Sequence, residues 1–239
     1  MIESILWAVA VIAPGALVAI ILHEVAHGWA ADALGDPTAR RLGRLSLNPA
    51  RHVDPFGTIA LPLLLFGFQI LTVGRVEFLF GWAKPVPVDT RHFRHPRQDM
   101  ALVAAAGPAI NLVLAVLFAL LFVLLLRLRD PTAGYLGETA RFAILINVLL
   151  MLFNLIPLPP LDGGRILVGV LPHDAARAVA RLEPAGLPLV LLGLFVLPLA
   201  LRELGIGFDP IGAVLLPALA WVSGLVLTMA AMALSLLGL

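Results

Sequence analysis

Six long apolar runs constrain most strongly what this chain can fold into. They span about residues 5–34, 56–74, 99–126, 141–158, 185–201 and 210–238. Most of them are long enough, as helices, to cross the roughly 30 Å of hydrocarbon in a bilayer. From Ala109 to Leu126 the only strongly polar side chain is Asn111, so the polar spacing of a helix in a soluble core is missing. These runs predict an all-α membrane protein with several crossings.

The composition supports the membrane assignment and excludes other classes. Of the 239 residues, 61% are hydrophobic and 13% are charged, which is far more apolar than one soluble core of this length requires. The formal net charge of +1 offers no polycationic surface for nucleic acid. Because the chain has no cysteine, any metal ion would have to bind His, Asp or Glu side chains.

Two stretches interrupt the helical pattern. Residues 76–88 read VEFLFGWAKPVPV, whose glycine and prolines favour an extended or hairpin segment. Residues 154–164 read NLIPLPPLDGG, whose prolines must break the fourth apolar run at membrane depth. Irregular backbone in a bilayer is tolerated only where protein or a water-filled cavity satisfies its polar groups. We therefore expect about five to six transmembrane helices, with a proline-broken helix and a re-entrant or hairpin segment close to a functional site.

The first run contains an H-E-x-x-H motif at residues 23–27. Positions i and i+4 of a helix lie one above the other, so the imidazoles of His23 and His27 can reach a single metal ion. Glu24 would then lie beside a water molecule on that ion, as in zinc hydrolases. Three ionisable groups in an apolar segment are costly to bury without a partner, so we favour a functional site over a set of ordinary interior polar residues.

A catalytic zinc ion usually keeps three protein ligands, so a third ligand is expected. Asp162 is the best candidate because it follows the proline-broken stretch and precedes two glycines, which permit a close backbone approach. His52, in the segment NPARHVDPFGT, is the alternative third ligand. An ordinary loop histidine without a metal role also fits its position, because unperturbed histidines are common in loops.

Three motifs together resemble the site-2 protease family of intramembrane zinc metalloproteases. They are the H-E-x-x-H helix, GPAIN at 107–111 and NLIPLPPLDGG at 154–164, and the resemblance covers residues 20–170. HVDPFGT and GWAKPVPVD resemble the small prokaryotic members without PDZ or CBS domains. The resemblance implies one zinc ion held by His23, His27 and Asp162, with Glu24 as general base and Asn154 as a substrate-positioning residue. Asn111 and His52 are candidate accessory residues.

The implied function is hydrolysis of peptide bonds in or near transmembrane segments of membrane-protein substrates, in the inner membrane of a prokaryotic cell. Residues 1–239 are expected to form one membrane-embedded metalloprotease domain, with a catalytic core at about 5–170 and accessory helices at about 185–238. The alternatives are a membrane transporter and a non-catalytic membrane chaperone on the same metal-binding scaffold. A transporter would more often show repeated halves, which we do not find, and a silent chaperone would have lost a ligand or the glutamate.

The ligand positions also predict a topology. The two histidines lie toward the C-terminal end of the first run, and Asp162 lies toward that of the fourth. For these ligands to meet at one depth in the membrane, the first and fourth runs should point the same way. An odd number of crossings must then separate them, which makes 56–74 re-entrant or interfacial. In that arrangement twelve of the sixteen basic residues lie on one side, as the positive-inside rule requires. With 185–201 and 210–238 each crossing once, we expect five spans, an outside N-terminus and a cytosolic C-terminus.

Overall fold

The computed structural model describes residues 2–72, 74, 76, 81–127, 131–207, 209 and 211–238, and these residues contain helices but no strand. The helices are α1 (Ile2–Ala33), α2 (Thr38–Arg41), α3 (Leu61–Thr72), α4 (Pro96–Arg127), α5 (Pro131–Asn154), α6 (Asp162–Val170), α7 (His173–Ala180), α8 (Glu183–Leu191), α9 (Leu197–Glu203) and α10 (Gly212–Leu236). Short 3-10 or π-helical turns cover Pro49–Arg51, Pro55–Ala60, Thr90–His92 and Leu192–Val196. The predicted all-α class is confirmed.

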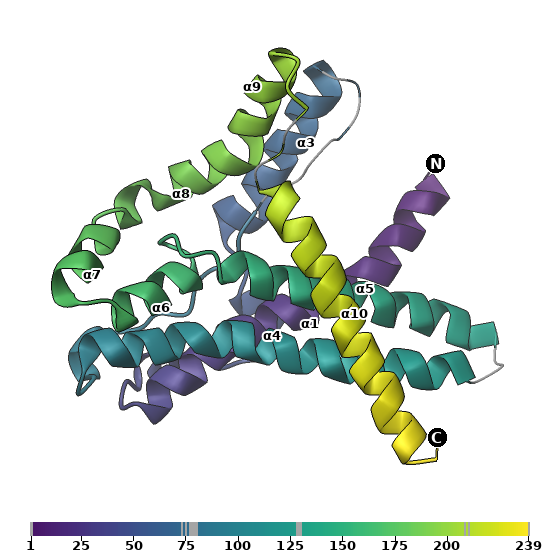
Figure 1. The fold of residues 1–239 in the computed structure, drawn as a ribbon, viewed down its shortest axis with the longest axis horizontal. Helices are drawn as coiled ribbons and strands as arrows, with labels where there is room; N and C mark the ends of the chain where they lie inside the picture. The colour runs from purple at the N-terminus through teal and green to yellow at the C-terminus, as the bar shows by residue number, and fades with distance from the viewer. Residues whose placement is uncertain are drawn as a thin grey trace.

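Three long helices, α1, α4 and α5, pack against one another along their lengths (Figure 1). α1 and α5 run in one direction and α4 in the other, so the prediction that the first and fourth apolar runs point the same way is confirmed. Small residues bring the helices close: a Cβ atom on Gly15 would lie 2.8 Å from the Cβ atom of Ala143. Close approach at small residues is how helices associate within lipid.

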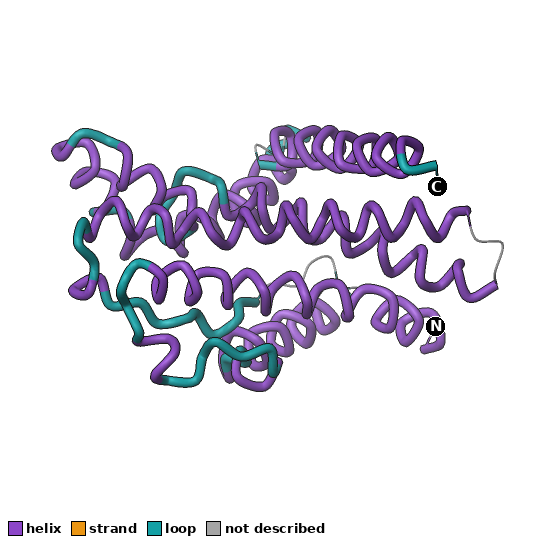
Figure 2. The backbone as a smooth tube through the Cα atoms, turned by 90° about the horizontal axis from the view of Figure 1, so that it is seen from below, coloured by secondary structure: helices purple, strands orange, loops and turns teal. Residues whose placement is uncertain are grey.

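The last helix, α10, covers the face of α4 and α5 opposite to α1 (Figures 1 and 2). The buried side chains between these helices are mostly small or β-branched and include Ala115, Ala119, Ile144, Val148, Val226 and Ala230. Their shape allows tight packing between helices, which supplies association energy where the surrounding lipid is itself apolar. α10 therefore belongs to the same bundle as the first three helices.

Five helical segments in the described part of the chain are long and apolar enough to span a membrane. They are Leu6–Ala33, Pro55–Thr72, Pro96–Leu126, Gly134–Asn154 and Gly212–Leu236. Large hydrophobic side chains such as Leu126 and Trp221 are exposed on them, which is unfavourable in water and expected in lipid. The chain is therefore an integral, multi-pass membrane protein.

The segment that contains α3 leaves the bundle and returns to the same end. α3 is steeply inclined to α1, α4 and α5 (Figure 1). The backbone N–H of Asp89 donates to Asp36 at 2.7 Å, and His92 Nδ1 lies 3.2 Å from Asp36 Oδ1. Burial opposes ionisation of Asp36, but hydrogen bonds from Thr38 and Asp89 hold its pKa below the ordinary value. The end of α1 thus meets the start of α4, as expected if 56–74 is not a single complete crossing.

The sequence-based boundaries of two runs were wrong. α5 begins at Pro131, ten residues before the predicted run, because proline is well suited to the first turn of a helix. The run at 185–201 does not form one straight crossing. It is divided into α8, a π-helical turn and α9, with Pro188 inside α8 and Pro198 in the first turn of α9.

The predicted position of the C-terminus was also wrong. α10 ends at the same end of the bundle as the N-terminus, the last turn of α4 and the first turn of α5 (Figures 1 and 2). The prediction assumed that both 185–201 and 210–238 cross once. α8 and α9 rise away from the bundle instead, and α10 alone crosses the face of α4 and α5 on the way back, at a slant (Figure 1).

This arrangement predicts the labelling of single cysteines by an impermeant thiol reagent on intact cells. Cysteines at Thr38 and Thr90 should share one side, because the residues around them are in direct contact. Cysteines at Thr132 and Leu237 should label together from the other side. The cysteine-free parent is the control. Finding positions 38 and 90 on opposite sides would contradict the structure.

Candidate metal centre

His23 and His27 lie one turn apart in the C-terminal half of α1 and face the same point. Their Nε2 atoms are 3.0 Å apart, and their rings meet edge to face with centroids 4.6 Å apart. His23 is buried and His27 is nearly so. The helical period alone produces this pairing, as the motif predicted.

Asp162 joins the two histidines from the first turn of α6. Its Oδ2 atom lies 3.2 Å from His23 Nε2 and 3.4 Å from His27 Nε2. The loop after α5 folds back on α6: a Cβ atom on Gly163 would lie 2.3 Å from the carbonyl oxygen of Leu155, and one on Gly164 would lie 2.1 Å from the nitrogen of Pro159. The two glycines thus permit the close approach that the sequence suggested.

These three ligand atoms fit a metal ion. They form a triangle with sides of 3.0, 3.2 and 3.4 Å. Neighbouring ligands of a tetrahedral zinc ion, each about 2.05 Å from the metal, are separated by about 3.3 Å. Among the described residues the buried Oδ2 atom of Asp162 has no hydrogen-bond partner, which is costly unless a cation satisfies it. In the described part of the chain, His23, His27 and Asp162 are the one group of three or more His, Cys, Asp or Glu side chains that could hold a metal ion.

The second nitrogen of each imidazole fixes its tautomer. His27 Nδ1 lies 2.8 Å from the carbonyl oxygen of Val103, which can only accept, so Nδ1 carries the proton. His23 Nδ1 lies 2.6 Å from Oδ1 of Asn111, which is fully buried on α4. Both Nε2 lone pairs therefore face the site, as in histidines that bind metals. Asn111, a candidate accessory residue, lies in direct contact with the candidate ligand His23.

Gly107 on α4 forms the wall behind both imidazoles. A Cβ atom there would lie 2.5 Å from Cε1 of each ring and 2.5 Å from Nε2 of His27. Any side chain at this position would displace the candidate ligands. The GPAIN motif thus contributes a glycine that makes room for the rings and an asparagine that holds one of them.

We expect Gly107→Ala to lower zinc affinity at least about tenfold, the lower end of what disturbed ligand orientation costs. The alanine should also destabilise the fold by about 1–3 kcal/mol through overpacking. Equilibrium zinc binding and thermal unfolding of the purified protein measure both effects. Gly224→Ala is the matched control, because a Cβ atom at this helical glycine of α10 meets no atom within 4 Å. Wild-type zinc affinity in Gly107→Ala would contradict the conclusion that a side chain at position 107 displaces the candidate ligands.

Glu24 is oriented by a backbone donor far away in the sequence. The N–H of Val86 donates to Glu24 Oε2 at 2.9 Å. Val86 belongs to residues 81–89, which are extended without forming a strand, while residues 77–80 of the predicted hairpin lie outside the described residues. The sequence predicts an extended segment here but not its contact with Glu24, because no local pattern indicates a partner 62 positions away.

The structure does not bring His52 to the metal centre. Its side chain is buried, with Nε2 2.7 Å from the carbonyl oxygen of Ser46. Its own carbonyl oxygen accepts from the N–H of Lys84 at 2.8 Å. Arg44 donates to the carbonyl oxygen of Lys84 at 2.8 Å. His52 and Arg44 thus hold the segment that reaches Glu24, and the alternative third ligand is not supported.

Asn154 lies at the end of α5, partly buried. Its Nδ2 atom donates to the carbonyl oxygen of Leu150 at 3.0 Å, a bond within its own helix. The structure therefore does not join Asn154 to the three candidate ligands. It does place this residue immediately before the loop that carries Asp162 into the centre.

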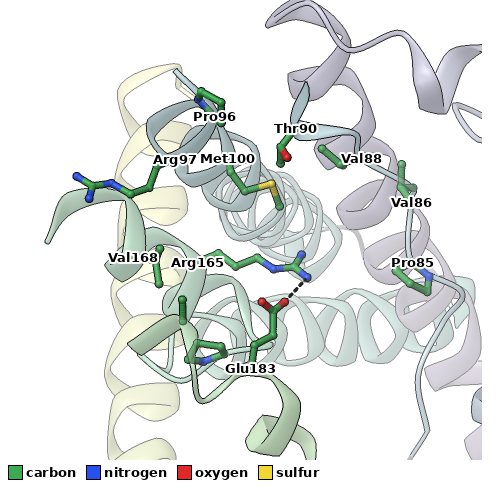
Figure 3. A pocket seen from close by; sticks show the side chains of 12 residues that line it. Pro85, Val86, Val88, Thr90, Pro96, Arg97, Met100, Arg165, Val168 and Glu183 are labelled. Atoms are coloured by element: carbon green, nitrogen blue, oxygen red, sulfur yellow. Dashed lines mark hydrogen bonds and ion pairs between the residues drawn. The ribbon is translucent and has the colours of Figure 1, made fainter. Parts of the chain in front are cut away.

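A pocket of about 530 Å³, shown in Figure 3, is lined in part by residues that contact or adjoin the residues of the centre. Val86, whose N–H holds Glu24, and Pro159, in the loop before Asp162, are among its lining residues. Its wall also contains apolar side chains from the extended segment, α4 and α6. Arg165 points into it and pairs with Glu183 at 3.4 Å. The pocket provides space for a ligand beside the candidate metal centre.

A membrane helix bundle with two histidines, one carboxylate and a neighbouring glutamate defines the class of the membrane metalloproteases. Residues 11–132 and 128–192 match Peptidase family M50. The chain belongs to this family, which confirms the resemblance to the site-2 proteases.

Two relatives show how far the similarity extends. A Bacillus subtilis (strain 168) protein named "Putative zinc metalloprotease YwhC" is 41% identical over 187 residues, covering 77% of this chain and 78% of the relative. A Mycolicibacterium smegmatis protein named "Putative zinc metalloprotease Rip2" is 34% identical over 178 residues, covering 74% of this chain and 64% of the relative. No solved structure shows a significant match.

Proposed function

We propose that this protein is an intramembrane zinc metalloprotease that hydrolyses peptide bonds in or near transmembrane segments of membrane-protein substrates, in the inner membrane of a prokaryotic cell. The observation that carries the proposal is the triangle of His23, His27 and Asp162, with Glu24 on the same helix as the histidines. The whole chain forms one protease domain, in which residues 5–170 are the catalytic core and residues 185–238 are accessory.

His23, His27 and Asp162 are the proposed ligands of one zinc ion. The names of the relatives support zinc, and two imidazoles with one carboxylate are a ligand set of catalytic zinc sites. When bound, zinc supplies a Lewis acid that activates water and polarises the scissile carbonyl. The protein contributes the fixed tautomers of both histidines and the buried carboxylate that balances the charge of the ion.

Glu24 is the proposed general base. It takes a proton from the attacking water and delivers it to the nitrogen of the leaving amine. The N–H of Val86 holds one carboxylate oxygen, so the direction of the carboxylate is set before substrate binds. The other oxygen is then the one assigned to proton transfer.

The substrate must present an unwound stretch of chain, because the peptide bonds inside a transmembrane helix are shielded. We assign this stretch to the pocket beside the centre, along residues 85–88. Val86 and Val88 contribute apolar lining there (Figure 3). Asn154 is the proposed polar contact for the opened backbone, and binding would require its amide to leave the carbonyl oxygen of Leu150.

Cleavage tests this proposal against a transporter and a non-catalytic chaperone. The purified protein, in liposomes with a tagged single-span substrate, should release fragments when zinc is present. A metal chelator should stop cleavage, and added zinc should restore it. A soluble, unstructured peptide of the same sequence serves as a control for the need for a bilayer. Cleavage that persists after metal removal, or no cleavage by fully zinc-loaded protein across a substrate panel, would refute the proposed protease.

A further inference from the structure

We propose that Asn147 of α5, acting through Asn111 of α4, is a positioning residue that fixes the imidazole of His23 for metal binding. This inference rests on the proposed function only in treating His23 as a metal ligand. Asn147 interrupts an apolar helix and no motif accounts for it. A fully buried amide at such a place is costly in lipid unless it has partners.

The three side chains form a continuous chain of hydrogen bonds across three helices. Asn147 lies on α5, Asn111 on α4 and His23 on α1. Nδ2 of Asn111 donates to Oδ1 of Asn147 at 2.9 Å, and Oδ1 of Asn111 lies 2.6 Å from Nδ1 of His23. Both asparagines are 0% exposed, so water does not compete for these bonds.

Two backbone carbonyls determine the direction of every bond in this chain. Nδ2 of Asn147 donates to the carbonyl oxygen of Ala143 at 2.8 Å, so its Oδ1 atom must face Asn111. Nδ2 of Asn111 also lies 3.3 Å from the carbonyl oxygen of Ala19, so its Oδ1 atom must face His23. His23 Nδ1 therefore donates, and the Nε2 lone pair points into the metal centre.

The two histidines depend on different kinds of support. His27 is held by a main-chain carbonyl, that of Val103, which no side-chain substitution removes. His23 is held by a side-chain amide that can rotate by half a turn and present Nδ2 instead of Oδ1. Asn147 opposes that rotation because its Oδ1 atom requires a donor, and its 2.9 Å bond from Nδ2 of Asn111 is shorter than the 3.3 Å contact of the same nitrogen with the carbonyl oxygen of Ala19. The packing of α5 thereby sets a ligand on α1.

We call the hydrogen-bonded series from Asn147 through Asn111 to His23 the relay. Zinc affinity of the full-length protein in detergent tests it. Asn147→Ala should weaken zinc binding about 10- to 100-fold, the range for loss of a partner that orients a ligand. The visible absorption band of the Co²⁺-loaded protein should change as well. Ser223→Ala is the matched control, because this buried hydroxyl on α10 donates within its own helix, to Leu219 at 2.6 Å. It should leave both readouts unchanged.

A second variant separates positioning from simple loss of packing. A carboxylate at position 111 accepts from His23 with either oxygen, so it needs no partner to fix its direction. Asn111→Asp combined with Asn147→Ala should therefore recover zinc affinity to within a few-fold of the wild type. Wild-type affinity in Asn147→Ala alone, or no recovery in the double variant, would overturn the relay. Absence of proteolysis would not change these readouts, so failure of the proposed function is distinguishable.

Discussion

Replacing Glu24 with glutamine is expected to abolish peptide cleavage while the protein still binds one zinc ion. The change removes the group that accepts the proton and leaves His23, His27 and Asp162 in place. The loss should be at least about 100-fold, the lower end of what general acid–base catalysis contributes. The amide can still accept a hydrogen bond from the N–H of Val86, so the position of residue 24 should be kept.

Cleavage of a single-span substrate in liposomes and zinc content by mass spectrometry measure the two expectations separately. Glu3→Gln is the matched control, because Glu3 is an exposed acidic residue in the first turn of the same helix. Turnover at the wild-type rate in Glu24→Gln would remove Glu24 from the role of general base. Loss of zinc would instead show that Glu24 belongs to the metal-binding group.

The second large effect is expected from alanine at each of the three candidate ligands. His23→Ala, His27→Ala and Asp162→Ala should each weaken zinc binding by more than the roughly 100-fold that loss of a supporting partner costs, because a direct bond to the metal is lost. Cleavage should disappear with the metal. Asp162→Ala is the most informative of the three, because the sequence left the third ligand open.

His52→Ala is the control for this series. His52 is buried and contacts Ser46 and Lys84, but it lies outside the group that could hold a metal ion. The variant should keep one equivalent of zinc after dialysis, even if its cleavage rate falls because the segment that holds Glu24 has shifted. A full equivalent of zinc in Asp162→Ala together with its loss in His52→Ala would reverse the assignment of the third ligand.

The sequence by itself predicted the features that depend on short-range periodicity. His23 and His27 face one point because four residues of helix return nearly to the same face. The apolar runs predicted a membrane protein because lipid leaves a helix as the simplest way to satisfy its backbone. Asp162 was predicted because the prolines before it indicate a broken helix and the two glycines after it permit a close approach of the backbone.

Other parts of the site depended on how helices pack, and only the tertiary structure decided them. Val86 reaches Glu24 across 62 positions, and Asn111 reaches His23 across 88, distances over which no local pattern constrains the chain. Asn147 gave no sequence signal, since an amide in an apolar helix looks the same whether it bonds to its own helix or to a neighbour.

The path of the chain through the bundle was likewise determined partly by the sequence and partly by the tertiary structure. Hydropathy identified 185–201 as an apolar run, but whether it forms one crossing depends on its prolines and on the surfaces available to α8 and α9. The 56–74 run could likewise cross or return, and the contacts of Asp36 with Asp89 and His92 bring together the chain before it and the chain after it. Helices form through hydrogen bonds between residues close in the chain, so the local sequence determines where they occur. Their partners are set by complementary surfaces that exist only after the chain has folded.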